Sequence, residues 1–173
     1  MPNSKSVIVV VDMQNDFITG SLGTAEAVGI VPAVKKFIKD AKANHIPLIF
    51  TRDTHPEDYL NTSEGKKLPV EHCIKGTKGW EICPELLPYT KDSLVIDKPT
   101  FGSPALADAV KEYDNIKLLG LCTGICVLSN AILLKAFYPE KNISVESSLS
   151  ACVTPETHKT ALAAMGLCQI DII

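Results

Sequence analysis

Continuous apolar runs alternate with amphipathic segments along this chain, and this pattern predicts strands that alternate with helices. Residues 6–12, Ser-Val-Ile-Val-Val-Val-Asp, are β-branched and apolar up to the aspartate, as in a strand covered on both faces. Residues 30–43 carry apolar side chains at helical spacing. A second apolar run, residues 47–53, also ends in an aspartate and predicts a second strand.

The alternation continues through the rest of the chain. Pro104 suits the first position of a helix, and Thr154 before a proline predicts an N-cap whose helix runs to about residue 165, with Gly166 as its stop. Another helical pattern opens at residue 125 or 126 and runs to about 137. The remaining apolar runs predict four more strands: 93–98, 116–122, 142–147 and 169–173.

Six strands that alternate with helices indicate an α/β fold with a mostly parallel six-stranded sheet. A chain of 173 residues with 46% hydrophobic content can bury one sizeable core, so we expect a single domain over residues 1–173. The net charge of −3, without a basic block, argues against nucleic-acid binding. Without a membrane-spanning run or a signal segment we expect no membrane association and a cytoplasmic location. The oligomeric state stays open, a homo-oligomer included.

The spacing of the cysteines indicates neither a metal site nor a disulfide framework. No pair has C-x-x-C spacing, and a chain with its own core does not need disulfides. We therefore expect mostly free, buried thiols. The six cysteines are Cys73, Cys83, Cys122, Cys126, Cys152 and Cys168.

Four reactive side chains lie at or just past the carboxyl ends of four successive predicted strands, where open α/β sheets bind their ligands. They are Asp12, Asp53, Lys98 and Cys126. Each alone has a structural explanation as a cap, a turn residue, a solvated charge or a small buried hydrophobe. Together they supply a nucleophile, a base and a cation on one rim, which favours nucleophilic catalysis.

Cys126 would lie in the first turn of its predicted helix. Unpaired backbone N–H groups and the helix dipole lower the pKa of a thiol there, so we expect a thiolate. The same N–H groups could hold the oxyanion of an acyl-transfer intermediate. A cysteine that is merely a small buried hydrophobe remains the alternative.

The polar segment 54–80 is longer than a simple connection and suggests function. Asp53 and His55 are two residues apart, and His72 follows later in this segment. One carboxylate and two imidazoles suit Zn²⁺ or another divalent transition ion. Solvated loop histidines are the alternative, and His45 and His158, outside this segment, are read as structural or surface residues.

Three segments resemble motifs of the isochorismatase-like cysteine hydrolases, and of nicotinamidases in particular: residues 11–17, 97–101 and 121–127. The resemblance follows the chain in order over nearly its whole length. It implies a Rossmann-like, three-layer αβα sandwich with a six-stranded parallel sheet. It also implies a catalytic triad of Asp12, Lys98 and Cys126.

In that family the cysteine attacks an amide carbonyl, the aspartate moves protons and the lysine stabilises the thiolate. The resemblance further implies an oxyanion hole formed by the N–H groups of Cys122 and Cys126. A cis peptide between Leu121 and Cys122 is expected on the same ground.

The resemblance extends to the metal ligands Asp53, His55 and His72. Many nicotinamidases have a further histidine where this chain has Glu64, which we expect as the fourth ligand. Zn²⁺ is the expected ion, with Fe²⁺ and Mn²⁺ as alternatives. Phe17 would form an aromatic wall of the substrate pocket, whereas Leu68 replaces the aromatic residue that many members stack on the substrate ring.

The implied reaction is the hydrolysis of nicotinamide to nicotinate and ammonia through a thioester on Cys126, with a small-molecule amide as the expected substrate. Two alternatives remain. The chain could hydrolyse another small amide or carbamoyl compound, because Leu68 changes the pocket. It could also be a non-catalytic α/β binding module, against which the joint presence of Asp12, Lys98 and Cys126 argues.

Overall fold

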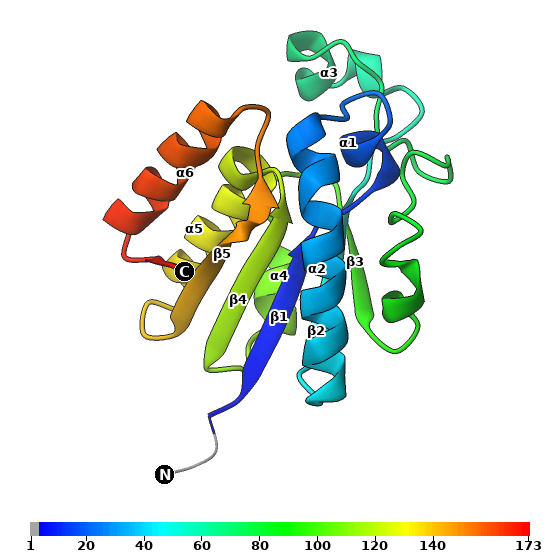
Figure 1. The fold of residues 1–173 in the computed structure, drawn as a ribbon. Coiled ribbons are helices and arrows are strands. Elements are labelled where there is room, and N and C mark those ends of the chain that lie inside the picture. The colour runs from blue at the N-terminus through cyan, green and yellow to red at the C-terminus, as the bar shows by residue number, and fades with distance from the viewer. Residues whose placement is uncertain (1–3) are drawn as a thin grey trace.

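The structure, a computed structural model, describes residues 4–173, and a parallel six-stranded sheet forms its centre (Figure 1). Neighbouring strands follow the order β3-β2-β1-β4-β5-β6, and every pair is parallel. The predicted α/β fold is thus confirmed. The strands are β1 (Ser6–Val11), β2 (Leu48–Asp53), β3 (Leu94–Lys98), β4 (Asn115–Leu121), β5 (Asn142–Ala151) and β6 (Asp171–Ile172).

Helices cover both faces of the sheet, as the three-layer expectation requires (Figure 1). On one face lie α1 (Asn15–Ile18) and α2 (Ala25–Ala43), and on the other lie α4 (Pro104–Ala109), α5 (Leu128–Phe137) and α6 (Pro155–Leu167). Over residues 4–173, none of the helices combines the length and the apolar character needed to cross a bilayer. The shorter helical segments are η1 (Tyr59–Asn61), α3 (Ser63–Lys67), η2 (Leu87–Thr90) and η3 (Thr123–Val127).

Strand β1 explains why its sequence is apolar without interruption. Its side chains alternate between the two cores, because Val7, Val9 and Val11 pack on the α5 side while Ile8 and Val10 pack on the α2 side. All five are at most 4% exposed. A strand covered on both faces has no position left for a polar side chain before the sheet ends.

Several predicted boundaries differ from the observed ones. Helix α2 begins at Ala25, earlier than predicted, because the Thr24 side chain accepts a hydrogen bond from the Ala27 N–H and caps it. Helix α6 has the predicted Thr154 cap but continues through Gly166. Strand β5 extends beyond the predicted 142–147, and β6 is shorter than the predicted 169–173.

The connection from β4 to α5 differs from the prediction in two ways. A π-helical turn, η3, precedes α5, so Cys126 lies in this turn and not in the first turn of an α-helix. The expected cis peptide between Leu121 and Cys122 is wrong, because residues 4–173 contain no cis peptide. A trans bond is favoured by about 2.5–4 kcal/mol at a non-proline residue, and Gly120, with φ +118°, lets the backbone change direction just before this bond.

The strand order places the crevice of the sheet between β1 and β4. Connections leave toward β2 on one side of β1 and return at β4 on the other, which defines a topological switch point. Asp12 follows β1 and the η3 turn follows β4, so both lie at this crevice. The fold thus brings together residues that are far apart in the sequence.

Replacing Gly120 should destabilise the protein. An alanine Cβ there would overlap the Val11 carbonyl oxygen, and φ +118° is strained for any side chain. We expect Gly120→Ala to lower the free energy of unfolding by roughly 2–4 kcal/mol in urea denaturation. Gly29→Ala is the matched control, because no atom lies within 4 Å of that Cβ. It should stabilise helix α2 by about 1 kcal/mol; equal stability of the two variants would contradict the strain at Gly120.

Candidate active site

Asp12 lies immediately after β1 in a conformation that is uncommon for a residue with a side chain. Its φ is +47°, in the left-handed region, and it is fully buried. The Thr51 hydroxyl donates a hydrogen bond of 2.6 Å to Asp12 Oδ1. Burial, followed by the nearby Asp53 carboxylate, raises the pKa of Asp12 against the opposing effect of Lys98. A buried carboxyl of raised pKa is a stronger proton acceptor than a solvated one.

Lys98, at the end of β3, connects the reactive groups. Its Nζ lies 2.6 Å from Asp12 Oδ2 and 3.4 Å from Asp53 Oδ1. It also donates a hydrogen bond of 3.2 Å to Cys126 Sγ. Burial opposes the charge of this ammonium, but Asp12, Cys126 and Asp53 outweigh burial and raise the pKa of Lys98 far above its usual value. The side chain therefore remains a cation.

Cys126 is buried, at 3% exposure, and differs from the acidic thiol expected from the sequence. Burial, followed by the charge of Asp12, raises its pKa well above the usual value, and Lys98 only partly offsets this. The expectation of a lowered pKa for this thiol is therefore wrong. It considered the helix start and Lys98 but not the two carboxylates that the fold places beside the sulfur.

Asn130, which the sequence analysis did not single out, fixes the turn that carries Cys126. Its Nδ2 donates hydrogen bonds of 2.8 Å to the Cys126 carbonyl and 3.0 Å to the Phe101 carbonyl. Its Oδ1 accepts one of 2.9 Å from the Ser103 N–H. The residue follows Cys126 by one helical turn, but nothing in the sequence shows that its amide joins two loops.

The four expected metal ligands come together beside Lys98. One donor atom each from Asp53, His55, Glu64 and His72 lies within 4.8 Å of all the others. The Nε2 atom of His55 lies 3.0 Å from Asp53 Oδ2, and that of His72 lies 3.7 Å from both Asp53 Oδ2 and Glu64 Oε1. A tetrahedral Zn²⁺ with bonds of about 2.1 Å separates its ligand atoms by roughly 3.4 Å. The donor set and its spacing therefore fit such an ion.

Hydrogen bonds prepare these donors for a cation. His72 Nδ1 lies 2.8 Å from the Val70 carbonyl, which can only accept, so Nδ1 carries the proton and Nε2 faces the cluster. Burial disfavours the charge of Asp53, yet the nearby His55 and His72 side chains and the charge of Lys98 hold its pKa far below the usual range. The carboxylate is thus ionised, as a metal ligand must be.

Gln14, which the sequence analysis also did not single out, hydrogen-bonds the backbone of Asp53. Its Nε2 donates hydrogen bonds of 2.9 Å to the Asp53 carbonyl and 2.8 Å to the Trp80 carbonyl. Its Oε1 accepts one of 2.7 Å from the Asp53 N–H. The amide thereby continues the pairing between β1 and β2 after the chain has left β1. A side chain that replaces a rung of the sheet cannot be recognised from residue type alone.

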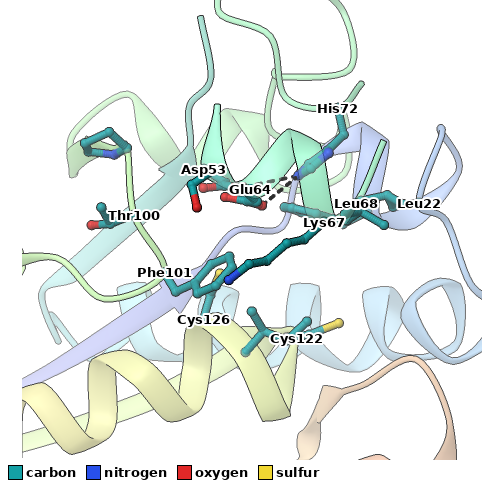
Figure 2. A pocket seen from close by; sticks show the side chains of 14 residues that line it. Leu22, Asp53, Glu64, Lys67, Leu68, His72, Thr100, Phe101, Cys122 and Cys126 are labelled. Carbon is teal, nitrogen blue, oxygen red and sulfur yellow. Dashed lines mark ion pairs between the residues drawn. The ribbon is translucent and has the colours of Figure 1, made fainter. Parts of the chain in front are cut away.

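A cavity of about 420 Å³ opens onto these groups (Figure 2). Cys126 lies at its floor, and Asp53, Glu64 and His72 lie along one side. The two predicted pocket residues, Phe17 and Leu68, both line it. Asp12, Lys98 and His55 are buried and are not among the lining residues. Lining residues that the sequence analysis missed are Leu22, Ser63, Lys67, Pro99, Thr100, Phe101 and Ile125.

The two histidines read as structural or surface residues lie outside the cavity. His45 is exposed and follows helix α2. His158, on α6, shares a hydrogen bond of 2.8 Å with the Thr123 hydroxyl at the start of η3, and its partial burial lowers its pKa. Neither residue joins the metal donors.

Comparison with known proteins gives a family match over almost the whole chain. The family model described as the isochorismatase domain matches residues 6–173. A relative from Arabidopsis thaliana, named a probable inactive nicotinamidase, is 31% identical over 169 residues, which cover 88% of this chain and 84% of that protein.

Solved structures share the fold over nearly their full length. The pyrazinamidase/nicotinamidase of Streptococcus mutans has a TM-score of 0.85 and 27% identity, covering 98% of this chain and 100% of the other. The pyrazinamidase of Pyrococcus horikoshii in complex with zinc has a TM-score of 0.82 and 26% identity, covering 98% of each chain. N-carbamoylsarcosine amidase from Thermoplasma acidophilum has a TM-score of 0.77 and 26% identity, covering 97% and 95%.

Replacing Gln14 should weaken metal binding, because Asp53 would lose both backbone hydrogen bonds that hold it. We expect Gln14→Met to reduce Zn²⁺ affinity by roughly 10-fold or more, measured by competition with a chromophoric chelator. Asn15→Ala, which removes a single exposed hydrogen bond to the Lys78 carbonyl, should leave the affinity near that of the wild type. A folded Gln14→Met protein with unchanged affinity would show that Gln14 does not position Asp53.

Proposed function

The chain belongs to the isochorismatase family, and we propose that it is a metal-dependent cysteine amidohydrolase that converts nicotinamide into nicotinate and ammonia. The main support is that a nucleophile, a base and a cation contact one another next to the cavity, beside four potential metal ligands. Lys98 Nζ contacts both Asp12 Oδ2 at 2.6 Å and Cys126 Sγ at 3.2 Å. Solved relatives named pyrazinamidase or nicotinamidase, one of them with zinc, support the substrate class.

In the proposed reaction Asp12 acts as the general base toward Cys126. The raised pKa of the Cys126 thiol means that a base must take its proton as the sulfur attacks the amide carbonyl. Asp12, whose own pKa is raised, accepts that proton. Lys98 stays charged throughout and offsets the negative charge that moves between Asp12 and the sulfur.

The attack forms a tetrahedral intermediate whose oxyanion would be held by the backbone N–H groups of Cys122 and Cys126. Asp12 then passes its proton to the departing nitrogen. Ammonia is released, and the acyl group remains bound to Cys126 as a thioester. Asp12 next removes a proton from a water molecule that attacks the thioester. Collapse of the second intermediate expels the sulfur, which takes the proton back from Asp12 and becomes the thiol again, while the product acid loses its own proton to solvent as the carboxylate.

Asp53, His55, Glu64 and His72 would hold one divalent ion, with Zn²⁺ as the proposed metal and Fe²⁺ or Mn²⁺ as alternatives. When bound, the ion would supply a Lewis-acid position for the pyridine nitrogen of the substrate. The chain itself would orient the ring between Phe17 and Phe101, which both line the cavity. The carboxamide would then face Cys126.

The second candidate substrate is another small amide or a carbamoyl compound. The likeness to N-carbamoylsarcosine amidase favours it, as does the aliphatic Leu68 in the cavity wall. Ammonia release from a panel of nicotinamide, pyrazinamide, aliphatic amides and N-carbamoyl amino acids separates the two. Turnover of carbamoyl compounds without turnover of nicotinamide would make this second candidate correct.

A non-catalytic protein is the remaining alternative, since one relative is named as probably inactive. The Cys126→Ala variant tests it. We expect this change to reduce ammonia release by about ten-thousandfold or more, because the nucleophile is lost. Cys122→Ala should be mild, because Cys122 would act through its backbone. Cys126→Ala turnover close to that of the wild type would refute the triad, and no turnover by the wild type on any amide would favour a binding protein.

Loss of the metal should affect substrates according to whether they carry a ring nitrogen. We expect His55→Ala to raise the KM for nicotinamide by roughly 10-fold or more and to change that for benzamide little, because benzamide lacks the nitrogen. His45→Ala, an exposed histidine outside the site, is the control and should match the wild type. An equal preference for nicotinamide over benzamide in wild type and His55→Ala would mean that the ion is structural.

A further inference from the structure

Cys122 and Cys152 occupy matching positions directly after two neighbouring parallel strands. Strands β4 and β5 pair in register at their last residues, Leu121 and Ala151, and the residue that follows each strand is a cysteine. Neighbouring strands lie about 4.8 Å apart. This separation falls within the Cα distances of disulfide bonds, roughly 4.4–6.8 Å. The sheet therefore holds the two residues at a distance that a disulfide can bridge.

The two side chains also lie on the same face. Leu121 and Ala151 both pack into the core on the α2 side, so alternation directs the following residues toward the α6 side. Cys122 keeps extended dihedrals, φ −83° and ψ 146°, so the alternation holds through it. Burial raises the pKa of the Cys122 thiol to about 12, and the adjacent Cys152 thiol adds to this effect. The thiols are therefore neighbours, and both are free.

Their surroundings connect this pair to the reactive turn. Cys122 is half-buried and lines the active-site cavity, whereas Cys152 is 4% exposed. A Cβ added at Gly124 would lie 3.3 Å from both Cys152 Sγ and Ala161 Cβ, so the η3 turn rests closely on the Cys152 sulfur. A small molecule in the cavity can reach Cys122, and the Cys152 sulfur lies against the turn that carries Cys126.

We propose that Cys122 and Cys152 form a redox modification site, at which a small hydroperoxide joins the two thiols in a disulfide bond and slows the enzyme. The proposed hydrolysis leaves both thiols unused, since Cys122 contributes its N–H group alone. The disulfide itself does not depend on the proposed function, whereas the loss of activity does.

The chemistry balances in two steps. The Cys122 thiolate attacks one peroxide oxygen, which gives a sulfenic acid and releases water once a proton is taken up. The Cys152 thiol then attacks the sulfenic sulfur, forms the S–S bond and expels a second water. The two thiols lose two electrons in total, and one hydrogen peroxide is reduced to two water molecules.

Bond formation changes the geometry of the turn. The two sulfurs must approach to about 2.05 Å, closer than unbonded thiols. This draws Cys122 toward β5 and shifts its N–H group away from the position proposed for the oxyanion. Because a misplacement of about 1 Å can reduce a rate by roughly 100-fold, we expect the oxidised enzyme to lose at least about 10-fold in kcat.

Peptide mapping tests the disulfide without any substrate. Cys126→Ser protein, which lacks the catalytic thiol, is treated with hydrogen peroxide, alkylated and digested without reduction. We expect one cross-linked species that joins the Cys122 and Cys152 peptides. Its formation should accelerate as the pH is raised, because the thiolate of Cys122 is the attacking form and its pKa is raised. Oxidation of Cys122 to a sulfinic acid while Cys152 stays reduced, or no oxidation of either residue, would overturn the proposal.

Activity measurements test the consequence. We expect wild-type activity to fall on peroxide treatment and to return with dithiothreitol, whereas Cys152→Ser should show no such reversible loss. Cys83→Ser, which removes a buried cysteine of the opposite core, should behave as the wild type does. An equal reversible loss in Cys152→Ser and wild type would overturn the regulatory role. If nicotinamide is not a substrate, the peptide map still decides whether the site exists.

Discussion

The buried ammonium of Lys98 is the interaction on which the rest of the site depends. It begins at the end of β3 and contacts Asp53 at the end of β2, Asp12 at the end of β1 and Cys126 in the turn after β4. These are four adjacent strands in the order of the sheet. A buried charge without a partner is strongly destabilising, so each contact constrains the residue that makes it. The strand order thus determines which residues can share one cation.

Asp53 joins the two halves of the site because its carboxylate oxygens face in different directions. Its Oδ1 faces Lys98 at 3.4 Å, and its Oδ2 faces His55 at 3.0 Å and His72 at 3.7 Å. A small shift of this side chain would therefore disturb the catalytic cation and the metal donors together. The two hydrogen bonds between the Gln14 side chain and the Asp53 backbone are consistent with this double role. Rigid support matters most where one group serves two functions.

Much of the fold and the reactive residues could be predicted from the sequence, for physical reasons. Buried parallel strands are largely apolar, and polar residues at or just past the carboxyl end of each strand mark the rim where ligands bind. Asp12, Asp53 and Lys98 were found in this way. Glu64 required a family resemblance, because its approach to His55 and His72 depends on the fold of the segment between β2 and β3. Gln14, Asn130 and Phe101 act through contacts between distant segments, which no local pattern records.

For the Cys126 thiol, the sequence predicts a pKa shift in the wrong direction. A cysteine near a helix start and a lysine is expected to be acidic, since both features favour the anion. The fold adds burial and two carboxylates, and the first of these, burial, has the largest effect on the pKa. Burial and the two carboxylates raise the pKa of the thiol, so the sulfur needs an acceptor for its proton. Reactivity then rests on the pairing of Cys126 with Asp12, whose own pKa is raised by the same burial. Burial thus raises the pKa of both partners: it disfavours the thiolate of Cys126 and makes Asp12 a stronger proton acceptor. Proton transfer at the moment of attack is therefore favoured over a thiolate that is formed in advance.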